Sequence, residues 1–258
     1  MDAAPAFKRG LVEPVDVKRI FFCGDPHGHF EHIIETVHAH RPVAIVLLGD
    51  VQPKEPLEQA LKPILALTEV WWIHGNHDTD SDADYDHLFG SALADRNLHG
   101  RVVEVAGVRI AGLGGIFREQ IWSASGQPRY PSAEAFLAQC GKGNRWRGGL
   151  PRKHRSSIFP SEFDPLLQEK ADVLVTHEAP SCHPHGFQVI DDLAASLGVG
   201  LAFHGHHHEH IDYRKEEATR LGFTPVGVAY CEIRNQLGHL VPTTCWRTAF
   251  PGDRLEER

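Results

Sequence analysis

The chain has 258 residues, of which 41% are hydrophobic and 23% are charged, the balance of an ordinary globular protein with a sizeable core. Its formal charge of −8 argues against a general nucleic-acid binder, since such proteins present a net basic face. No stretch approaches the roughly 20 apolar residues of a membrane span. Residues 1–14 hold no apolar run long enough for a signal peptide, and the five cysteines are odd in number and far apart. We therefore expect a cytoplasmic protein with no membrane partner.

Buried strands alternate with amphipathic helices in the first third of the chain. The apolar runs predict strands at Val17–Gly24, Val43–Leu48 and Val70–Ile73, and the periodicity predicts helices at Phe30–His40 and Pro56–Leu67. Pro63 implies a kink or an early end in the second helix. This βαβαβ order predicts right-handed crossovers and a parallel sheet.

The rest of the chain predicts a second sheet. Strands Arg101–Val105 and Val108–Leu113 flank the hairpin signal Ala106-Gly107. Gly114–Pro160 lacks periodicity and is rich in Gly, Pro, Ser and Arg, so we expect an irregular basic insertion at about residues 117–160 (the insertion). Further expected elements are helices at Tyr85–Leu93, Glu162–Lys170 and Val189–Leu197, strands at Asp172–Thr176 and Gly200–Phe203, and closing strands of the second sheet within Thr224–Arg234 and Leu240–Trp246. We expect one domain over residues 1–258.

Five of the predicted strands end in polar side chains. The carboxyl ends of parallel strands share one edge of a sheet, where ligands gather. Seven metal donors follow these strands: Asp25, His27, Asp50, Asn76, His177, His206 and His208. Seven are too many for one tetrahedral ion and suit two ions that share a carboxylate. Imidazole and carboxylate without thiolate favour two divalent ions from Mn, Fe, Zn, Ni and Co. The alternative, a hydrogen-bonded set without metal, leaves costly buried aspartates.

The order of these motifs resembles the calcineurin-like metallophosphoesterases. The motifs are Asp25-Pro26-His27, Gly49-Asp50, Gly75-Asn76-His77-Asp78, His177 and Gly205-His206-His207-His208. The resemblance implies an α/β fold, a four-layer αββα sandwich of two mixed β-sheets flanked by helices. It implies one metal on Asp25, His27, Asp50 and His208, and another on Asp50, Asn76, His177 and His206, with Asp50 as the bridge.

The resemblance also implies a reaction. A hydroxide bridging the two metals would attack the phosphorus of a phosphodiester or phosphomonoester. His77 is not needed as a ligand, and we expect it to protonate the leaving group. Asp78 would orient His77 and raise its basicity. The alternative is that His77 and Asp78 form a structural pair behind the metals.

Two departures from the family pattern bear on the substrate. Where protein phosphatases of this superfamily continue Gly-Asp-x-x-Asp-Arg-Gly, this chain has Gly49-Asp50-Val51-Gln52-Pro53-Lys54. His74 stands where they carry a phosphate-binding arginine. A serine/threonine-type protein phosphatase is therefore disfavoured, and the Gly-His-x-His ending resembles the branch with small-molecule phosphodiesterases and nucleases.

A basic stretch at residues 142–155 has six cationic side chains and no acidic one. One hypothesis is a lid that recruits phosphate through Arg152 and Arg155, and the alternative is a solvated loop. We expect a small-molecule or nucleotide-like phosphoester substrate, with nucleic acid only as a substrate. The sequence leaves the oligomeric state open. A catalytically silent metal-binding scaffold for protein partners is the remaining alternative, and the presence of His77 disfavours it.

Overall fold

The computed structural model describes residues 20–124 and 126–243. The first sheet has the strand order β3-β2-β1-β9, in which β1 (Ile20–Cys23), β2 (Ala44–Leu48) and β3 (Glu69–Ile73) are parallel and β9 (Ile233–Asn235) is antiparallel to β1. Every residue of β2 is buried, because both faces of the sheet are covered. The predicted parallel βαβαβ unit is confirmed.

The second sheet has the order β4-β5-β6-β7-β8. Its strands are β4 (Arg101–Val105), β5 (Val108–Leu113), β6 (Val173–Thr176), β7 (Leu201–His204) and β8 (Thr224–Gly227). The pair β4–β5 is the predicted hairpin, and β5 to β8 are parallel. The sheet is therefore mixed, and its parallel strands place the turns after β6 and β7 at one edge.

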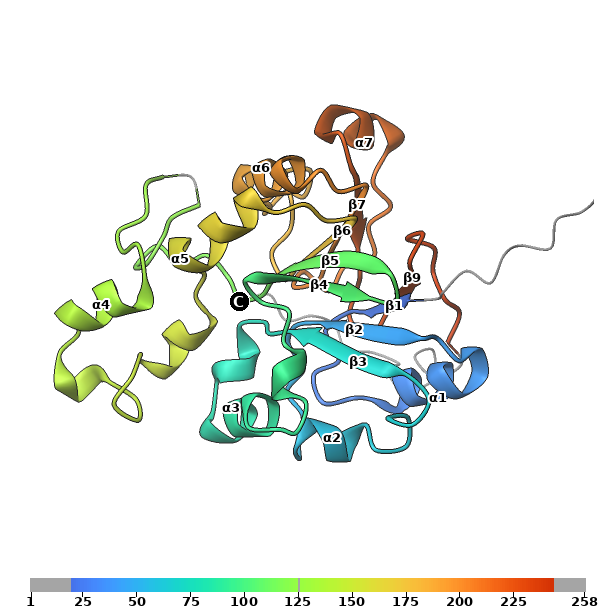
Figure 1. Cartoon of the computed structure of the whole chain (residues 1–258), viewed down its shortest axis with the longest axis horizontal. Coiled ribbons are helices and arrows are strands. Elements are labelled where there is room, and N and C mark those ends of the chain that lie inside the picture. Colours follow the sequence, from blue (N-terminus) through green and yellow to red (C-terminus); the bar gives the residue numbers. More distant parts are fainter. Residues whose placement is uncertain (1–19, 125, 244–258) are drawn as a thin grey trace, which may run out of the picture.

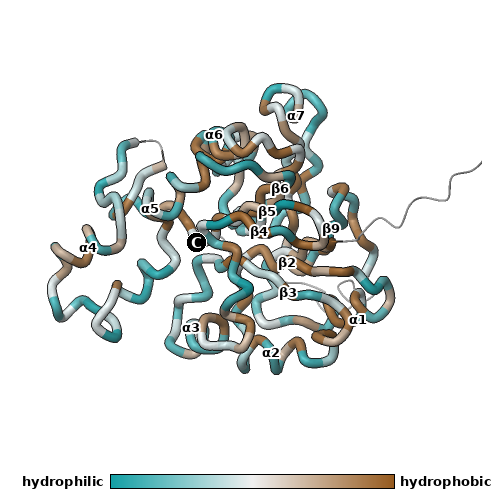
Figure 2. The backbone as a smooth tube through the Cα atoms, viewed as in Figure 1, coloured by the Kyte–Doolittle hydropathy of each residue, from teal (hydrophilic) through white to brown (hydrophobic). Residues whose placement is uncertain are grey.

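The two sheets pack face to face (Figure 1). Strand side chains alternate, so Phe22 of β1 points between the sheets and stacks on Phe203 of β7 with ring centroids 3.8 Å apart. Its neighbours Phe21 and Cys23 instead join the cluster beneath the helices. Hydrophobic stretches run along the central strands, whereas the outlying α7 is mostly hydrophilic (Figure 2).

Helices cover the outer faces of both sheets. On the first sheet lie α1 (Glu31–His40), α2 (Leu57–Ala60) and α3 (Asp82–Phe89), and on the second lie α5 (Pro160–Phe163) and α6 (Gln188–Leu197). Ile33 and Val37 of α1, four residues apart, are buried against the first sheet. The αββα sandwich expected from the family resemblance is confirmed. Among the described residues, no helix is long and apolar enough to cross a membrane.

Several predicted elements differ from the structure. The expected helix at Pro56–Leu67 has α-geometry only in α2, and Pro63 lies in the turns that follow. The helix expected at Glu162–Lys170 is divided into α5 and a 3₁₀ turn, Asp164–Gln168, with Pro165 in its first turn. The closing strand β9 joins the first sheet, not the second, and residues 244–246 of the last predicted strand lie outside the described residues.

The insertion is more ordered than expected. It contains α4 (Ala133–Gln139), whose first turn is capped by the Ser132 side chain accepting from the Ala135 N–H at 3.2 Å. Two short 3₁₀ turns follow, Lys142–Asn144 and Arg152–Ser156. Trp122 and Phe136 anchor the insertion in the hydrophobic cluster under α6. The exposed α7 (Lys215–Leu221) was not predicted.

Candidate metal centre

The backbone turns sharply at the strand ends that carry the predicted ligands. Five of the seven ligands have φ in the left-handed region: Asp25, His27, Asp50, His206 and His208, with φ of 24°, 43°, 44°, 74° and 57°. L-residues rarely adopt this conformation, which costs about 1–3 kcal/mol per residue and persists only where the surrounding fold enforces it. The fold thus keeps these side chains in place at a local energetic cost, as is typical of functional sites.

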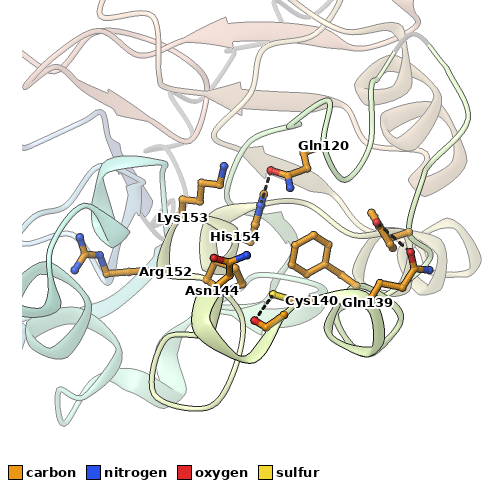
Figure 3. A pocket seen from close by; sticks show the side chains of 11 residues that line it. Gln120, Gln139, Cys140, Asn144, Arg152, Lys153 and His154 are labelled. Atoms are coloured by element: carbon orange, nitrogen blue, oxygen red, sulfur yellow. Dashed lines mark hydrogen bonds between the residues drawn. The ribbon is translucent and has the colours of Figure 1, made fainter.

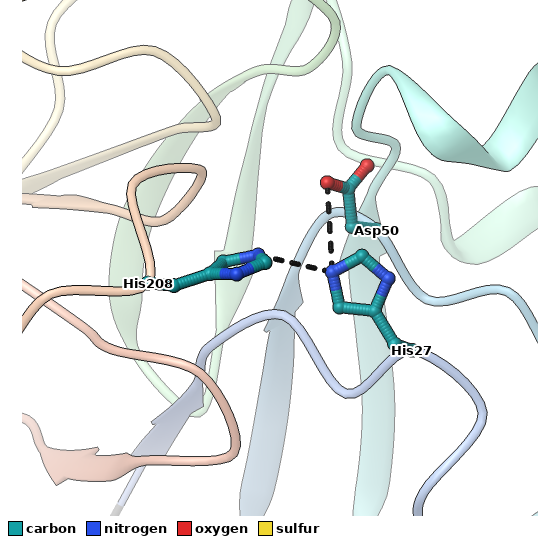
Figure 4. A group of neighbouring side chains, drawn as sticks. All are labelled: His27, Asp50 and His208. Atoms are coloured by element: carbon teal, nitrogen blue, oxygen red, sulfur yellow. Dashed lines mark hydrogen bonds and ion pairs between the residues drawn. The ribbon is translucent and has the colours of Figure 1, made fainter. Parts of the chain in front are cut away.

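The first group of ligands joins three strand ends: His27 follows β1, Asp50 follows β2 and His208 follows β7 (Figure 4). The Nε2 atoms of His27 and His208 are 3.0 Å apart, and His27 Nε2 is 3.9 Å from Asp50 Oδ2. Two imidazole nitrogens this close need either a shared proton or a cation between them. A divalent ion bound at about 2.1 Å from each Nε2 atom would satisfy both nitrogens.

The second group also includes Asp50 and joins it to His177 and His206. His177 Nε2 lies 3.4 Å from Asp50 Oδ2 and 3.2 Å from the Asn76 side-chain oxygen. Asp50 Oδ2 therefore faces both groups. It is buried and has no hydrogen-bond partner among the described residues, which is the state expected of an oxygen that bridges two cations.

Asp25 belongs to neither three-residue group, and it contacts His206 and His177 of the second. Its Oδ2 accepts the backbone N–H of His206 at 2.8 Å. Its Oδ1 is buried without a hydrogen-bond partner among the described residues and lies 3.6 Å from His177 Nδ1. A second orphaned carboxylate oxygen at the same place strengthens the fit between this donor set and divalent cations.

Hydrogen bonds outside the ligand set orient two of the histidines. His27 Nδ1 lies 2.6 Å from Gln52 Oε1, and His177 Nδ1 lies 2.9 Å from the Leu48 carbonyl oxygen. Both acceptors require a proton on Nδ1, which leaves the Nε2 lone pair free for a metal. Gln52 lies in the segment that departs from the protein-phosphatase pattern, so the departure has a positioning role.

The electrostatics of the site favour cation binding. Burial and, to a smaller extent, the charge of His177 lower the pKa of His206 to about 3. Burial and, to a smaller extent, the charge of His27 lower the pKa of His208 to about 4. Both are neutral ligands at pH 7. Burial opposes charge on His177, but the carboxylates of Asp50 and Asp25 outweigh it and raise its pKa to about 10. A cation would replace that proton.

His77 and Asp78 differ from the predicted pair. His77 Nδ1 contacts Asp80 Oδ2 at 2.5 Å, and its ring is partly exposed beside His27. Asp78 is fully buried and instead accepts the backbone N–H groups of Gln52 and Gly75, both at 2.8 Å. The expectation that Asp78 orients His77 is wrong. The turn after β3 directs the Asp78 side chain into the interior, and Asp80 is the aspartate that contacts the His77 ring.

The insertion is fastened to α3 by its basic side chains. The Arg152 guanidinium donates to Asp82 Oδ1 at 2.6 Å and to the carbonyl oxygens of Thr79 and Asp80. Arg155 donates to the Tyr85 hydroxyl and packs over that ring. All three guanidinium nitrogens of Arg152 thus have protein partners, whereas Arg155 has no ion pair among the described residues and its Nε has no hydrogen-bond partner. Phosphate recruitment by Arg152 and Arg155 stays a prediction.

A cavity of about 430 Å³ lies within the insertion, behind the turn that carries Arg152 (Figure 3). His154 Nε2 contacts Gln120 Oε1 on its wall at 3.1 Å, and Lys153 and Asn144 also line it. None of the predicted metal ligands is among the lining residues.

Sequence reasoning missed several residues around the centre. Glu178 is buried and directly follows His177, with Oε2 4.0 Å from His206 Nε2. Tyr230 lies with its ring centroid 5.6 Å from that of His27 and 5.3 Å from that of His208. The position of Glu178 beside a predicted ligand was a usable signal, whereas Tyr230 is far in sequence from every motif.

Comparisons with known proteins place this chain in a family. The model of the calcineurin-like phosphoesterase family matches residues 18–210, so the chain belongs to that family, whose members are metal-dependent hydrolases of phosphoesters. An uncharacterized protein of Haemophilus influenzae is 45% identical over 207 residues, covering 79% of this chain and 91% of the relative. The crystal structure of TT1561 of Thermus thermophilus superposes with a TM-score of 0.55 at 14% identity, covering 87% of this chain and 97% of that one. That likeness concerns the fold alone.

Proposed function

We propose that this chain is a dinuclear metal-dependent phosphoesterase that hydrolyses a phosphodiester or phosphomonoester. The observation that carries the proposal is Asp50 Oδ2, a buried and unpartnered oxygen shared by both three-residue ligand groups of the described residues. Asp25, His27, Asp50 and His208 would hold one ion, and Asp50, Asn76, His177 and His206 the other. When bound, the ions would supply a deprotonated water at neutral pH and neutralise charge on the phosphoryl group.

His77 would donate the proton that the leaving oxygen needs. Its side chain is 46% exposed and so open to substrate, while its backbone N–H donates to Asp50 Oδ1 at 2.8 Å. That hydrogen bond fixes His77 relative to the bridging carboxylate. Asp80 accepts a hydrogen bond from Nδ1–H and thereby fixes the orientation of the ring.

The substrate we propose is a small-molecule or nucleotide-like phosphoester rather than a phosphoprotein. His74 is buried against His99, and burial together with that neighbour holds its pKa well below the usual value. It is therefore uncharged and cannot replace a phosphate-binding arginine. We also propose a cytoplasmic location, which is supported by the free thiols of the four described cysteines, Cys23, Cys140, Cys182 and Cys231.

The test is hydrolysis of bis-p-nitrophenyl phosphate and p-nitrophenyl phosphate by chelator-treated protein after addition of Mn, Co, Ni or Zn. We expect metal-dependent release of p-nitrophenol, and the ratio of the two rates gives the diester or monoester preference. Asp50→Asn should abolish metal-dependent hydrolysis. The control is Asp95→Asn, a residue far from the site in sequence, which should not change the rate. Protein that is inert with every metal would refute the proposed function.

A further inference from the structure

Arg118 lies at the start of the insertion, just after β5, next to the turn that carries Asn76 and His77. Its Nη2 donates to Ser156 Oγ at 3.2 Å. That hydroxyl in turn lies 3.5 Å from the Asn76 carbonyl oxygen and 2.8 Å from Thr79 Oγ1. The guanidinium therefore stands beside the turn that supplies a ligand of the second ion.

On its other side Arg118 faces the turn after β6. The preceding residue, Phe117, donates its backbone N–H to Glu178 Oε1 at 3.0 Å, and Glu178 directly follows the ligand His177. The charges of Asp80 and Glu178 both act on Arg118. The segment of Phe117 and Arg118 thus contacts the turn of His177 through Glu178 and lies one hydroxyl group, that of Ser156, from the turn of Asn76.

The charge of Arg118 has no close counter-ion. Within 4.0 Å it forms no salt bridge to any described carboxylate, although the side chain is half-buried and its Nε has no hydrogen-bond partner among the described residues. By contrast, Arg147 is paired with Asp82 and Asp86, and Arg152 with Asp82. A half-buried guanidinium with no ion pair, and with donors beyond the one that Ser156 accepts, can take an anion at a lower desolvation cost than a fully hydrated one.

We propose that Arg118 binds a phosphoryl oxygen of the substrate beside the second ion. This rests on the proposed function, since the anion is the phosphate that the metals would hold. The planar guanidinium can donate parallel N–H groups to two phosphate oxygens. Alternatively, it donates one N–H to a phosphate oxygen while Nη2 still donates to Ser156 Oγ. A purely structural role, in which Arg118 only ties the insertion to Ser156, is the alternative.

The test measures binding of inorganic phosphate to manganese-loaded protein by titration calorimetry, with metal content and melting temperature recorded for each variant. Arg118→Gln should raise the Kd for phosphate roughly 10- to 100-fold, the range for hydrogen bonds to charged groups. Arg118→Lys keeps the charge but loses the fork, so its Kd should lie in between. The control is Arg109→Gln, an exposed partner of Glu169, which should match wild type.

Three outcomes would overturn the proposal, and they differ from one another. Wild-type phosphate affinity in Arg118→Gln, with hydrolysis intact in the parent, refutes the role of Arg118 alone. Metal loss or a lowered melting temperature in both Arg118 variants assigns a structural role instead. A wild-type protein that binds metal but neither binds phosphate nor hydrolyses esters refutes the proposed function together with this inference.

Discussion

Asp78 and Asp80 both lie in the turn that follows β3, but one side chain is buried and the other is exposed. Asp78 is fully buried and accepts two backbone N–H groups, which ties the turn after β2 to the turn after β3. The side chain of Asp80 is 55% exposed and contacts His77. Both aspartates lie within three residues of His77, but the sequence does not say which one faces the histidine, because that depends on how the 3₁₀ turn His77–Thr79 is oriented.

Replacing these two aspartates should change the free energy of unfolding by very different amounts. Asp78→Ala leaves two buried N–H groups without an acceptor, and at about 1–3 kcal/mol each we expect a loss of about 2–6 kcal/mol in unfolding free energy. Asp80→Ala should change it by no more than about 0.5 kcal/mol. Urea unfolding of the metal-free proteins measures both, and equal losses would show that the surroundings of the two aspartates do not differ in this way.

His77 should matter in proportion to how much the leaving group needs a proton. For alkyl phosphoesters, His77→Gln should lower kcat by roughly 10²- to 10⁴-fold, the range for general acid catalysis. p-Nitrophenolate leaves without a proton, so its esters should lose much less. Rates across a series of leaving groups measure this, with metal content as the control. A uniform loss across the series would argue against a proton-donor role.

At the scale of elements, the sequence predicts the parts whose apolar pattern is local. The aliphatic run Val43–Leu48 and the strands around it are legible because their residues are buried on both faces. The helix α7 has no buried residue and hence no apolar stripe to read. All seven predicted ligands could be proposed from polar strand ends, and Glu178 could have been added because it directly follows one of them. Gln52 and Arg118 could not, because their contacts depend on turns brought together by the fold.

The junction between the insertion and α3 is a further case in which sequence alone is ambiguous. A basic stretch and an acidic stretch each look like solvated loops, yet Asp82 accepts from Trp146, Arg147 and Arg152. Asp82→Ala should raise the rate of tryptic cleavage within residues 142–155 about 3- to 10-fold, since these exposed contacts are individually weak. Asp84→Ala, whose side chain contacts Ser81 of its own helix, is the matched control. Unchanged cleavage in Asp82→Ala would show that the junction does not fasten the insertion.

At the scale of the whole molecule, two buried groups, Asp25 and His32, make stability depend on pH in opposite directions. Burial raises the pKa of Asp25 to about 8. Just below that pH the folded chain binds a proton on Asp25 that the unfolded chain does not, so Asp25 adds stability as pH falls. Burial lowers the pKa of His32 on α1 to about 4. Because the unfolded chain takes up that proton below about pH 6.5 and the folded chain does not, His32 costs stability as pH falls from about 6.5 to 4.

Substitution isolates the histidine contribution from the opposing carboxylates. Between pH 7.5 and pH 5.0, metal-free His32→Asn should lose about 1–2 kcal/mol less unfolding free energy than wild type. Urea midpoints at the two pH values measure the difference. Parallel losses in the two proteins would mean that His32 is protonated in the folded state and that burial does not lower its pKa.

The carboxylate of Asp50 is the centre of the proposed dinuclear site, and metal stoichiometry after dialysis is its sharpest test. Elemental analysis should find two divalent ions per chain in wild type. His208→Ala and His206→Ala should each retain about one ion, from opposite groups, because each belongs to only one of them. Asp50→Ala should retain less than one, because Asp50 belongs to both. One ion or none in wild type, or two ions retained in Asp50→Ala, would contradict a dinuclear centre bridged by Asp50.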